Sequence, residues 1–318
     1  TPTTPKPTTP KPTTPKPGES TDLITFGFLG GKWVPQHQMV ISVDDGGFRQ
    51  GVTAVERLRT YGHAIFELNP HLDRWQHSTS QMGIAGLPPL ADIDALLQEL
   101  LSRNQQTLDL QGEVGITLFA TPGTAASEAA TFGMHINRLD LSRIQGRQES
   151  GQALVVTDIQ QPSPQCWPRT IKVRSRLHYH LADQVARQKD PTASGVLVDN
   201  DGTITETSIS NIAIVKAEKI SSPPRDRVLR GITQAFVEQM AREIQIDWST
   251  SPITTTDLLE ADEVLLMGTD GGLWFANSVN ENAIGQGEAR PTYQALQQQF
   301  QSKLDAVQNS NTSNSQAF

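Results

Sequence analysis

The first 17 residues form a tandem repeat that limits how much of the chain can fold. They comprise seven threonines, seven prolines and three lysines, with Thr-Thr-Pro-Lys-Pro written three times. Proline at this density favours extended polyproline II, so we expect residues 1–20 to be a disordered Pro/Thr/Lys linker. Residues 306–318 are rich in Asn, Ser and Gln and are also expected to be disordered. A core must then form from about 280 residues, enough for two modest domains.

Charge and cysteine content exclude several classes of protein. The chain has 26 basic and 34 acidic residues, and without the three linker lysines the remainder is near −11. Such an acidic body argues against nucleic acid and anionic membranes as partners. The single cysteine, Cys166, excludes an intramolecular disulfide framework and a zinc-ribbon site. No apolar run approaches the roughly 20 residues of a membrane span. We expect a soluble protein.

The pattern of apolar residues predicts two domains of α/β (α+β) class. Residues 21–137 contain short apolar stretches, bounded by turn residues, around one leucine-rich helical stripe, which indicates a small α+β domain. Residues 138–150 are polar and lack periodicity, which favours an interdomain loop. Residues 151–305 contain more strands and two amphipathic helices, and predict a larger mixed domain.

Common nucleotide and metal motifs are absent from the sequence. It has neither Gly-x-x-x-x-Gly-Lys-Ser/Thr nor a strand-borne Gly-x-Gly-x-x-Gly, and no Gly-x-Ser-x-Gly nucleophile elbow. The histidine pairs His71 with His77 and His178 with His180 lack acidic or cysteine partners at ligand spacing. We expect no metal.

Four segments stand out because their polar residues adjoin regular elements. They are His71-Leu-Asp-Arg74, Thr170-Ile-Lys172-Val-Arg-Ser-Arg-Leu177, Asp201-Gly-Thr-Ile-Thr-Glu206-Thr-Ser-Ile-Ser-Asn211, and the pair Leu229-Arg-Gly231-Ile-Thr233 and Met267-Gly268-Thr269.

The order and spacing of these segments resemble the class IV, or fold type IV, pyridoxal-phosphate aminotransferases. That family includes branched-chain and D-amino-acid aminotransferases and aminodeoxychorismate lyase. The resemblance covers residues 23–304, and Gly51, Glu56 and Arg59 match the family's Gly-x-x-x-x-Glu-x-x-Arg segment. It implies a smaller N-terminal α+β domain, a larger C-terminal β-barrel-like α/β domain, pyridoxal 5′-phosphate as cofactor, and a homodimer.

The resemblance also implies roles for individual residues. Lys172 would be the Schiff-base lysine, and Glu206 would pair with the pyridinium nitrogen of the cofactor. Arg74 would bind the 5′-phosphate bidentately. The other expected phosphate contacts are Gly231, Ile232 and Thr233, which open a helix whose free N–H groups suit a phosphate, and Thr269.

The surroundings of Lys172 in the sequence suit a reactive amine. A Schiff base forms only from the neutral amine, which partial burial and nearby positive charge favour. Lys172 lies between the apolar Ile171 and Val173 and close to Arg174 and Arg176. Without the resemblance, a lysine at a strand end would be read as a solvated surface residue.

Several departures from the family concern the substrate. Five residues after the lysine, where branched-chain enzymes have a tyrosine, this chain has Leu177. The strand ending Ala120-Thr121-Pro122-Gly123 lacks the arginine that takes a substrate carboxylate in some branches of the family. We therefore expect substrate contacts from a different set of residues, namely Phe48, Arg49, Arg176 and Asp270.

The resemblance implies a transaminase acting on an amino donor and a keto-acid acceptor. A carbon–carbon lyase resembling aminodeoxychorismate lyase is the main alternative, since Lys-x-x-Ser-Arg-Leu is similar to its motif. The third interpretation is a non-catalytic binding module whose pyridoxal site has decayed. We expect a cytoplasmic location; the linker resembles those of modular secreted carbohydrate-active enzymes, so a fusion or secreted context stays open.

Overall fold

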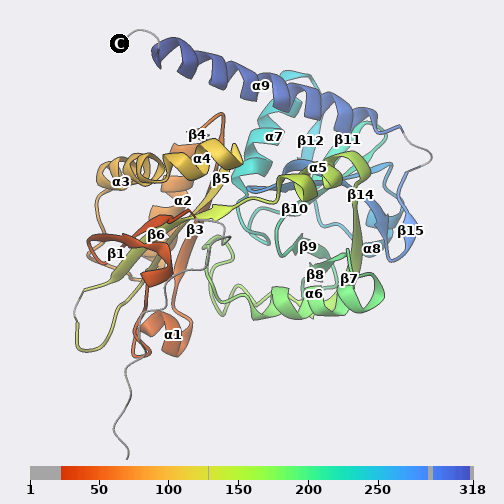
Figure 1. The fold of residues 1–318 in the computed structure, drawn as a ribbon. Helices are drawn as coiled ribbons and strands as arrows, with labels where there is room; N and C mark the ends of the chain where they lie inside the picture. The colour runs from red at the N-terminus through yellow and green to blue at the C-terminus, as the bar shows by residue number, and fades with distance from the viewer. Residues whose placement is uncertain (1–22, 128, 286–288, 316–318) are drawn as a thin grey trace, which may run out of the picture.

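The computed structural model describes residues 23–127, 129–285 and 289–315, with side chains as far as residue 306. The expected linker, residues 1–20, lies outside the described residues. Figure 1 shows two sheets side by side, the smaller built from the red-to-yellow half of the chain and the larger from the green-to-blue half. Among the described residues no helix is both long and apolar enough to cross a bilayer.

The smaller sheet has, in the described residues, six antiparallel strands in the order β2-β1-β6-β5-β3-β4. Its central strand β5 is buried along its whole length. Trp75 and Leu97, from two covering helices, share a hydrophobic cluster with Leu58, Ile116 and Met134 of the strands. The elements of this half are β1 (Phe26–Leu29), β2 (Lys32–Pro35), the 3-10 helix η1 (Gln36–Gln38), α1 (Gly46–Gln50), β3 (Ala54–Tyr61), β4 (Ala64–Ile65), α2 (Leu68–Gln81), α3 (Leu90–Arg103), α4 (Gln105–Gln111), β5 (Val114–Thr121) and β6 (Thr131–Arg138).

The larger sheet has nine strands in the part of the chain that the structure describes, and it mixes parallel with antiparallel pairs. Its path runs β12-β11-β10-β13-β14-β7-β8-β9, and β9 pairs back with β10 through Glu206 and Asn211. This pairing closes a barrel-like ring, which confirms the expected fold class. The strands are β7 (Gln152–Gln160), β8 (Ser194–Val198), β9 (Ile204–Thr207), β10 (Asn211–Lys216), β11 (Lys219–Ser222), β12 (Trp248–Thr250), β13 (Glu263–Gly268), β14 (Gly272–Val279) and β15 (Asn282–Ala283).

Helices cover both sides of the larger sheet. In Figure 1, α6 runs along the lower edge of the view, while α7 and the long α9 lie above the sheet. Phe236 of α7 and Phe300 of α9 stack edge-on, 5.4 Å between ring centroids. These helices are α5 (Leu141–Ser150), α6 (Leu177–Lys189), α7 (Ile232–Glu243), α8 (Thr255–Leu259) and α9 (Pro291–Ser315).

The interdomain loop expected at residues 138–150 is largely helical. Asp140 caps α5 by accepting a hydrogen bond from the Arg143 N–H, and Gly151 ends the helix with a φ of 78°. None of its residues is buried. A helix that buries no apolar side chain leaves no apolar periodicity in the sequence, which explains why the pattern suggested a loop.

The C-terminal stretch differs from expectation in a similar way. Its composition predicted disorder from residue 306, whereas α9 continues to Ser315. Gln, Ala and Lys are tolerated well within helices, and the Asn/Ser content that suggested disorder does not interrupt the helix.

Candidate active site

Lys172 belongs to the segment that leads from β7 into α6, yet this segment is bound to the smaller sheet. The Lys172 carbonyl accepts a hydrogen bond from the Val55 N–H of β3 (3.0 Å), and Ala54 and Val173 form a β-bridge. The Lys172 N–H donates to Ser78 Oγ of α2 (3.0 Å). The lysine is therefore positioned by β3 and α2, although the chain reaches it from the larger sheet.

The Lys172 side chain lies in a cavity that lowers the pKa of its amine. Burial, with the positive charges of Arg74 and Arg176, lowers the pKa of Lys172 to about 8 against the opposing effect of Glu56 and Glu206. Within the described residues its amine forms no hydrogen bond or ion pair. An amine in this state can act as a nucleophile or exchange a proton near neutral pH.

Glu206, in β9, faces the same cavity with a fully surrounded carboxylate. Oε1 accepts hydrogen bonds from the Tyr179 hydroxyl (2.6 Å) and Gln161 Nε2 (3.0 Å), and Oε2 accepts from Asn211 Nδ2 (3.1 Å) and the Leu229 N–H (3.2 Å). Burial raises the pKa of Glu206, while the hydrogen bonds from Tyr179 and Leu229 lower it. These four donors fix a buried carboxylate at the wall of the cavity.

The N-terminus of α7 opens onto the cavity at Gly231, Ile232 and Thr233. No side chain in the described part of the chain caps this helix, so its first N–H groups remain available to an anion. A Cβ on Gly231 would overlap the Asn211 side chain, so only glycine fits here. Thr269 follows β13 on another wall of the cavity.

Arg74 reaches the cavity from α2 and is anchored by Glu56. The alternation of β3 turns Glu56 toward α2, where its carboxylate accepts from Arg74 Nε (3.0 Å) and Nη2 (2.6 Å). Arg74 Nη1 donates to the Arg230 carbonyl (2.8 Å), leaving two of the five guanidinium N–H groups for a ligand. The edge from Nε to Nη2 is thus taken by Glu56, and a phosphate would meet the remaining N–H groups.

Glu56 also contacts His71, one helical turn before Arg74. His71 Nδ1 lies 2.9 Å from Glu56 Oε1, and both side chains are fully buried. Although burial opposes it, Arg74 and His71 hold the pKa of Glu56 far below its ordinary range, and burial lowers the pKa of His71. We therefore take His71 as neutral, with Nδ1–H donating to the carboxylate.

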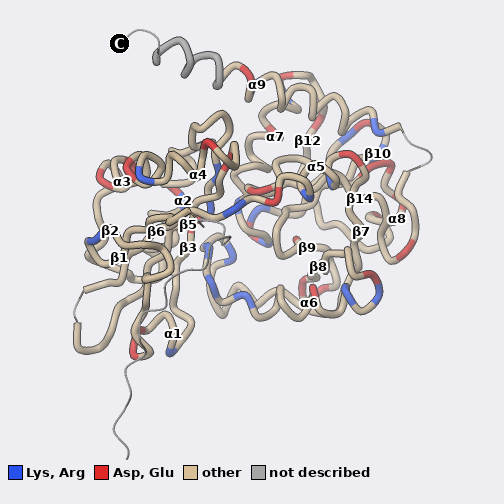
Figure 2. Tube along the Cα trace, viewed as in Figure 1, with Lys and Arg blue, Asp and Glu red and all other residues tan. Residues whose placement is uncertain are grey.

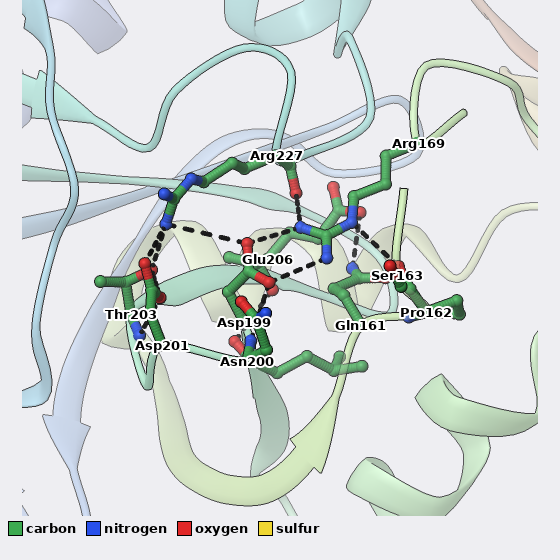
Figure 3. A network of polar contacts seen from close by, with 12 residues as sticks. Gln161, Pro162, Ser163, Arg169, Asp199, Asn200, Asp201, Thr203, Glu206 and Arg227 are labelled. Carbon is green, nitrogen blue, oxygen red and sulfur yellow. Dashed lines mark hydrogen bonds and ion pairs between the residues drawn. The ribbon is translucent and has the colours of Figure 1, made fainter. Parts of the chain in front are cut away.

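A polar network centred on the buried pair of Arg169 and Asp199 supports the two loops that contact Glu206 (Figure 3). Arg169 pairs with Asp199 through two hydrogen bonds (2.7 and 2.9 Å) and donates to the carbonyls of Pro162 (3.0 Å) and Arg227 (3.2 Å). Arg227 in turn binds Asp201 (2.6 Å). The network therefore fixes the segment that carries Gln161 and the segment that ends at Leu229.

Nine of the eleven residues predicted from the sequence line two connected spaces. Asp270 lines the cleft that adjoins the Lys172 cavity and pairs with Arg57 through two hydrogen bonds (2.7 and 2.9 Å). Phe48 and Arg49 do not line either space; they lie on α1, where Phe48 is 74% exposed. The eight that line the Lys172 cavity itself are Lys172, Arg74, Glu206, Gly231, Ile232, Thr233, Thr269 and Arg176.

Sequence reasoning missed Tyr179 and Gln161, which contact Glu206, and Ser78, which fixes the Lys172 backbone. Ser78 lies four residues after Arg74 on α2, so the two share one helix face, and this spacing could have suggested it. No pattern in the sequence pairs Tyr179 or Gln161 with Glu206.

The arrangement suits a ligand with two different ends. An anionic group fits at the open N-terminus of α7 near Arg74, and a nitrogen that carries a proton fits at Glu206, with the Lys172 amine in the same cavity. No group of three or more His, Cys, Asp or Glu side chains suited to a metal occurs in the residues that the structure covers.

Comparisons with known proteins show the family to which the chain belongs. The family model described as amino-transferase class IV matches residues 53–279. The branched-chain-amino-acid aminotransferase-like protein 2 of Arabidopsis thaliana is 27% identical over 288 residues, which are 87% of this chain and 50% of that protein, so the chain spans about half of its length. The D-alanine aminotransferase of Bacillus licheniformis is 24% identical over 280 residues, 86% of this chain and 95% of that protein.

Among solved structures, the branched-chain amino acid aminotransferase of Escherichia coli has the same fold. Its TM-score is 0.80 at 20% identity, over 88% of this chain and 94% of that one.

Proposed function

The chain belongs to the amino-transferase class IV family, and we propose that it transfers an amino group between an amino acid or amine and a 2-oxo acid. Pyridoxal 5′-phosphate is the cofactor of this family, and when bound it supplies an electron-accepting ring that stabilises negative charge on the substrate carbon. The observation that carries the proposal is one cavity that combines the Lys172 amine, the buried Glu206 carboxylate and the uncapped start of α7.

In this proposal Lys172 is the point of covalent attachment and the proton carrier. With a pKa lowered to about 8, the amine can accept a proton from the substrate carbon and return it at neighbouring positions. Arg176, whose guanidinium donates to the Ser208 carbonyl and stacks 4.4 Å from the Tyr179 ring, keeps positive charge beside the amine.

Glu206 would hold the cofactor's ring nitrogen in its protonated form. Its own position is set by Tyr179, Gln161, Asn211 and Leu229, so the carboxylate cannot swing away from the cavity.

We assign the phosphate end to the start of α7, with the Thr233 hydroxyl, Thr269 and the two spare N–H groups of Arg74. Together these groups would concentrate an anion in a chain whose net charge is −8.

The test is covalent capture of the cofactor. Borohydride treatment of the purified protein should fix the cofactor to the chain and raise its intact mass, and Lys172→Ala should abolish this gain. Lys219→Ala, which removes a lysine that is 74% exposed, is the matched control and should retain it. A mass gain that survives Lys172→Ala would refute the assignment.

The carbon–carbon lyase stays an alternative that the same preparation can separate. Incubation with amino donors alone should remove the visible absorbance of a transaminase, whereas release of pyruvate from aminodeoxychorismate would identify a lyase. A preparation that never retains cofactor would point to the decayed module.

A homodimer is also part of the proposal. An apolar segment before and within α1 lacks cover in the described chain, with Val40, Val43 and Phe48 exposed by 79%, 70% and 74%. Light scattering should give twice the chain mass, and Phe48→Asp should weaken the association. The two-domain division and a cytoplasmic location stay predictions.

A further inference from the structure

A cleft of about 540 Å³ adjoins the Lys172 cavity and shares Lys172, Arg176 and Thr269 with it. It lies between β3 and β6 of the smaller sheet on one side and α5, α6 and the start of β14 on the other. Of the described residues, eight basic and three acidic ones line it, an excess of five positive charges in a chain of net charge −8. Figure 2 shows Lys and Arg segments where the chain leading into α6 passes between the two sheets.

The carboxylates in this cleft are already engaged. Asp270 binds Arg57, and Asp183 pairs with Arg187 (3.6 Å) and accepts from the Gly195 N–H (3.1 Å). Asp140 is occupied as the cap of α5. The cleft therefore keeps an excess of positive charge that the described residues do not neutralise.

The arginines that remain fall into two groups. The lysine-side group is Arg174 and Arg176, and the pKa of Arg174 is lowered by burial and then by the charges of Arg176 and Arg57. The α5-side group is Arg138 at the end of β6 with Arg143 and Arg147 of α5. Burial, followed by the charge of Arg143, lowers the pKa of Arg147.

The α5-side arginines form no ion pair with a carboxylate in the described part of the chain. Arg147 lies over the Trp274 ring at 5.9 Å, and Arg138 and Arg143 are exposed to the cleft and solvent. Guanidinium groups gathered without an ion-pair partner favour an anionic ligand with oxygen acceptors.

We propose that the substrate carries a second anionic group, a carboxylate or a phosphate, which binds the α5-side arginines while its first carboxylate binds the lysine-side group. Two separate arginine groups in one cleft match an elongated acid with charge at both ends. This proposal rests on the proposed function, because it takes Lys172 as the reacting end. It assigns Arg138 and Arg143 as specificity-determining residues.

Non-reacting acids of equal length test the proposal without turnover. Calorimetric titration of the cofactor-loaded protein, in low-salt buffer, would compare adipate with hexanoate and with 5-phosphonopentanoate. We expect a dianion to bind at least about tenfold more tightly than hexanoate. The tighter of adipate and 5-phosphonopentanoate identifies the distal group as carboxylate or phosphate.

Variants test whether the α5-side arginines cause the tighter binding of a dianion. Arg138→Gln with Arg143→Gln should remove the advantage of the dianion and leave hexanoate binding unchanged. Arg103→Gln, at an exposed arginine of α3 paired with Glu99, is the control and should change neither the dianion affinity nor the hexanoate affinity. Equal binding of dianions and hexanoate, or a dianion advantage that survives the double variant, would overturn the proposal. Failure of the proposed function would instead appear as loss of the Lys172-dependent mass gain.

Discussion

The Tyr179 hydroxyl donates a 2.6 Å hydrogen bond to Glu206 Oε1, joining the first turns of α6 to strand β9 inside the cavity. This bond connects the segment that follows Lys172 with the carboxylate assigned to the cofactor ring. Gln161, Asn211 and the Leu229 N–H also donate to Glu206, which makes this carboxylate one of the most constrained groups in the site.

Tyr179→Phe should weaken both the fold and the cofactor site. Glu206 would lose one of two donors on Oε1, and hydrogen bonds to charged groups contribute about 1.5–3 kcal/mol. Urea unfolding should show a loss of that size, and titration should show weaker cofactor binding. Tyr293→Phe removes a hydroxyl that donates to the Gln148 carbonyl (2.8 Å), and it should lower stability alone. Equal effects of both variants on cofactor affinity would contradict this role for Tyr179.

Glu56→Gln should destabilise the protein strongly at neutral pH. Arg74 would keep its buried charge without a full partner, a loss of about 3–5 kcal/mol. Because the folded pKa of Glu56 is depressed, its contribution is present above the unfolded value of 4.5 and is lost as pH falls toward the folded value. Urea midpoints across pH should therefore converge for wild type and variant in acid. The exposed pair of Glu99 and Arg103 gives a control, and Glu99→Gln should cost less than about 1 kcal/mol.

Cofactor attachment should accelerate with pH. The Lys172 amine has a pKa lowered to about 8, so below pH 8 its neutral fraction rises about tenfold per pH unit, and the rate should level off above it. Arg176→Gln removes a charge that lowers this pKa, and the midpoint should move to higher pH. Stopped-flow absorbance after addition of pyridoxal 5′-phosphate measures the attachment rate at each pH and the midpoint of its pH dependence, with Arg103→Gln as control. An unchanged midpoint in Arg176→Gln would show that this arginine does not act on the amine.

Burial of Lys172 should also appear in the stability of the cofactor-free protein. Its folded pKa lies below the unfolded value of 10.5, so the unfolded chain binds more protons between about pH 8 and 10.5. Lys172 therefore contributes a gain in stability as pH rises through this window. In Lys172→Met that contribution should be absent, which urea midpoints at pH 8 and pH 10 can measure.

Arg169→Lys should disturb the site from a distance. Lysine keeps the charge but cannot reproduce the double hydrogen bond to Asp199 with the contacts to Pro162 and Arg227. We expect a loss of roughly 1–3 kcal/mol in urea unfolding and weaker cofactor binding, because Gln161 and Leu229 lose their support. Arg225→Lys, at an arginine 59% exposed and paired with Glu238, should leave cofactor binding intact.

Much of the fold, and most of the residues that line the cavity, could be predicted from the sequence. Glycine and threonine turns beside regular elements marked Gly231, Thr233 and Thr269, and these line one cavity with Lys172. Tyr179 and Gln161 lie 27 and 45 residues before Glu206 and outside its strand, so their contacts with its carboxylate leave no local pattern. Helix α5 escaped prediction because it buries none of its side chains. Phe48 and Arg49 lie on α1, outside the two spaces around Lys172, and their expected substrate contacts stay a prediction.

The hydrogen bonds of Lys172 to β3 and α2 have a mechanical consequence. The lysine and Arg74 are held by the smaller sheet and its helix, whereas Glu206, Thr233 and Thr269 are held by the larger sheet and its helices. A ligand bound by both sets would cross-link the two halves, so any hinge motion between them would strain its contacts. Filling the cavity should therefore make the halves unfold as one unit, and the occupied protein should resist proteolysis between them better than the empty one.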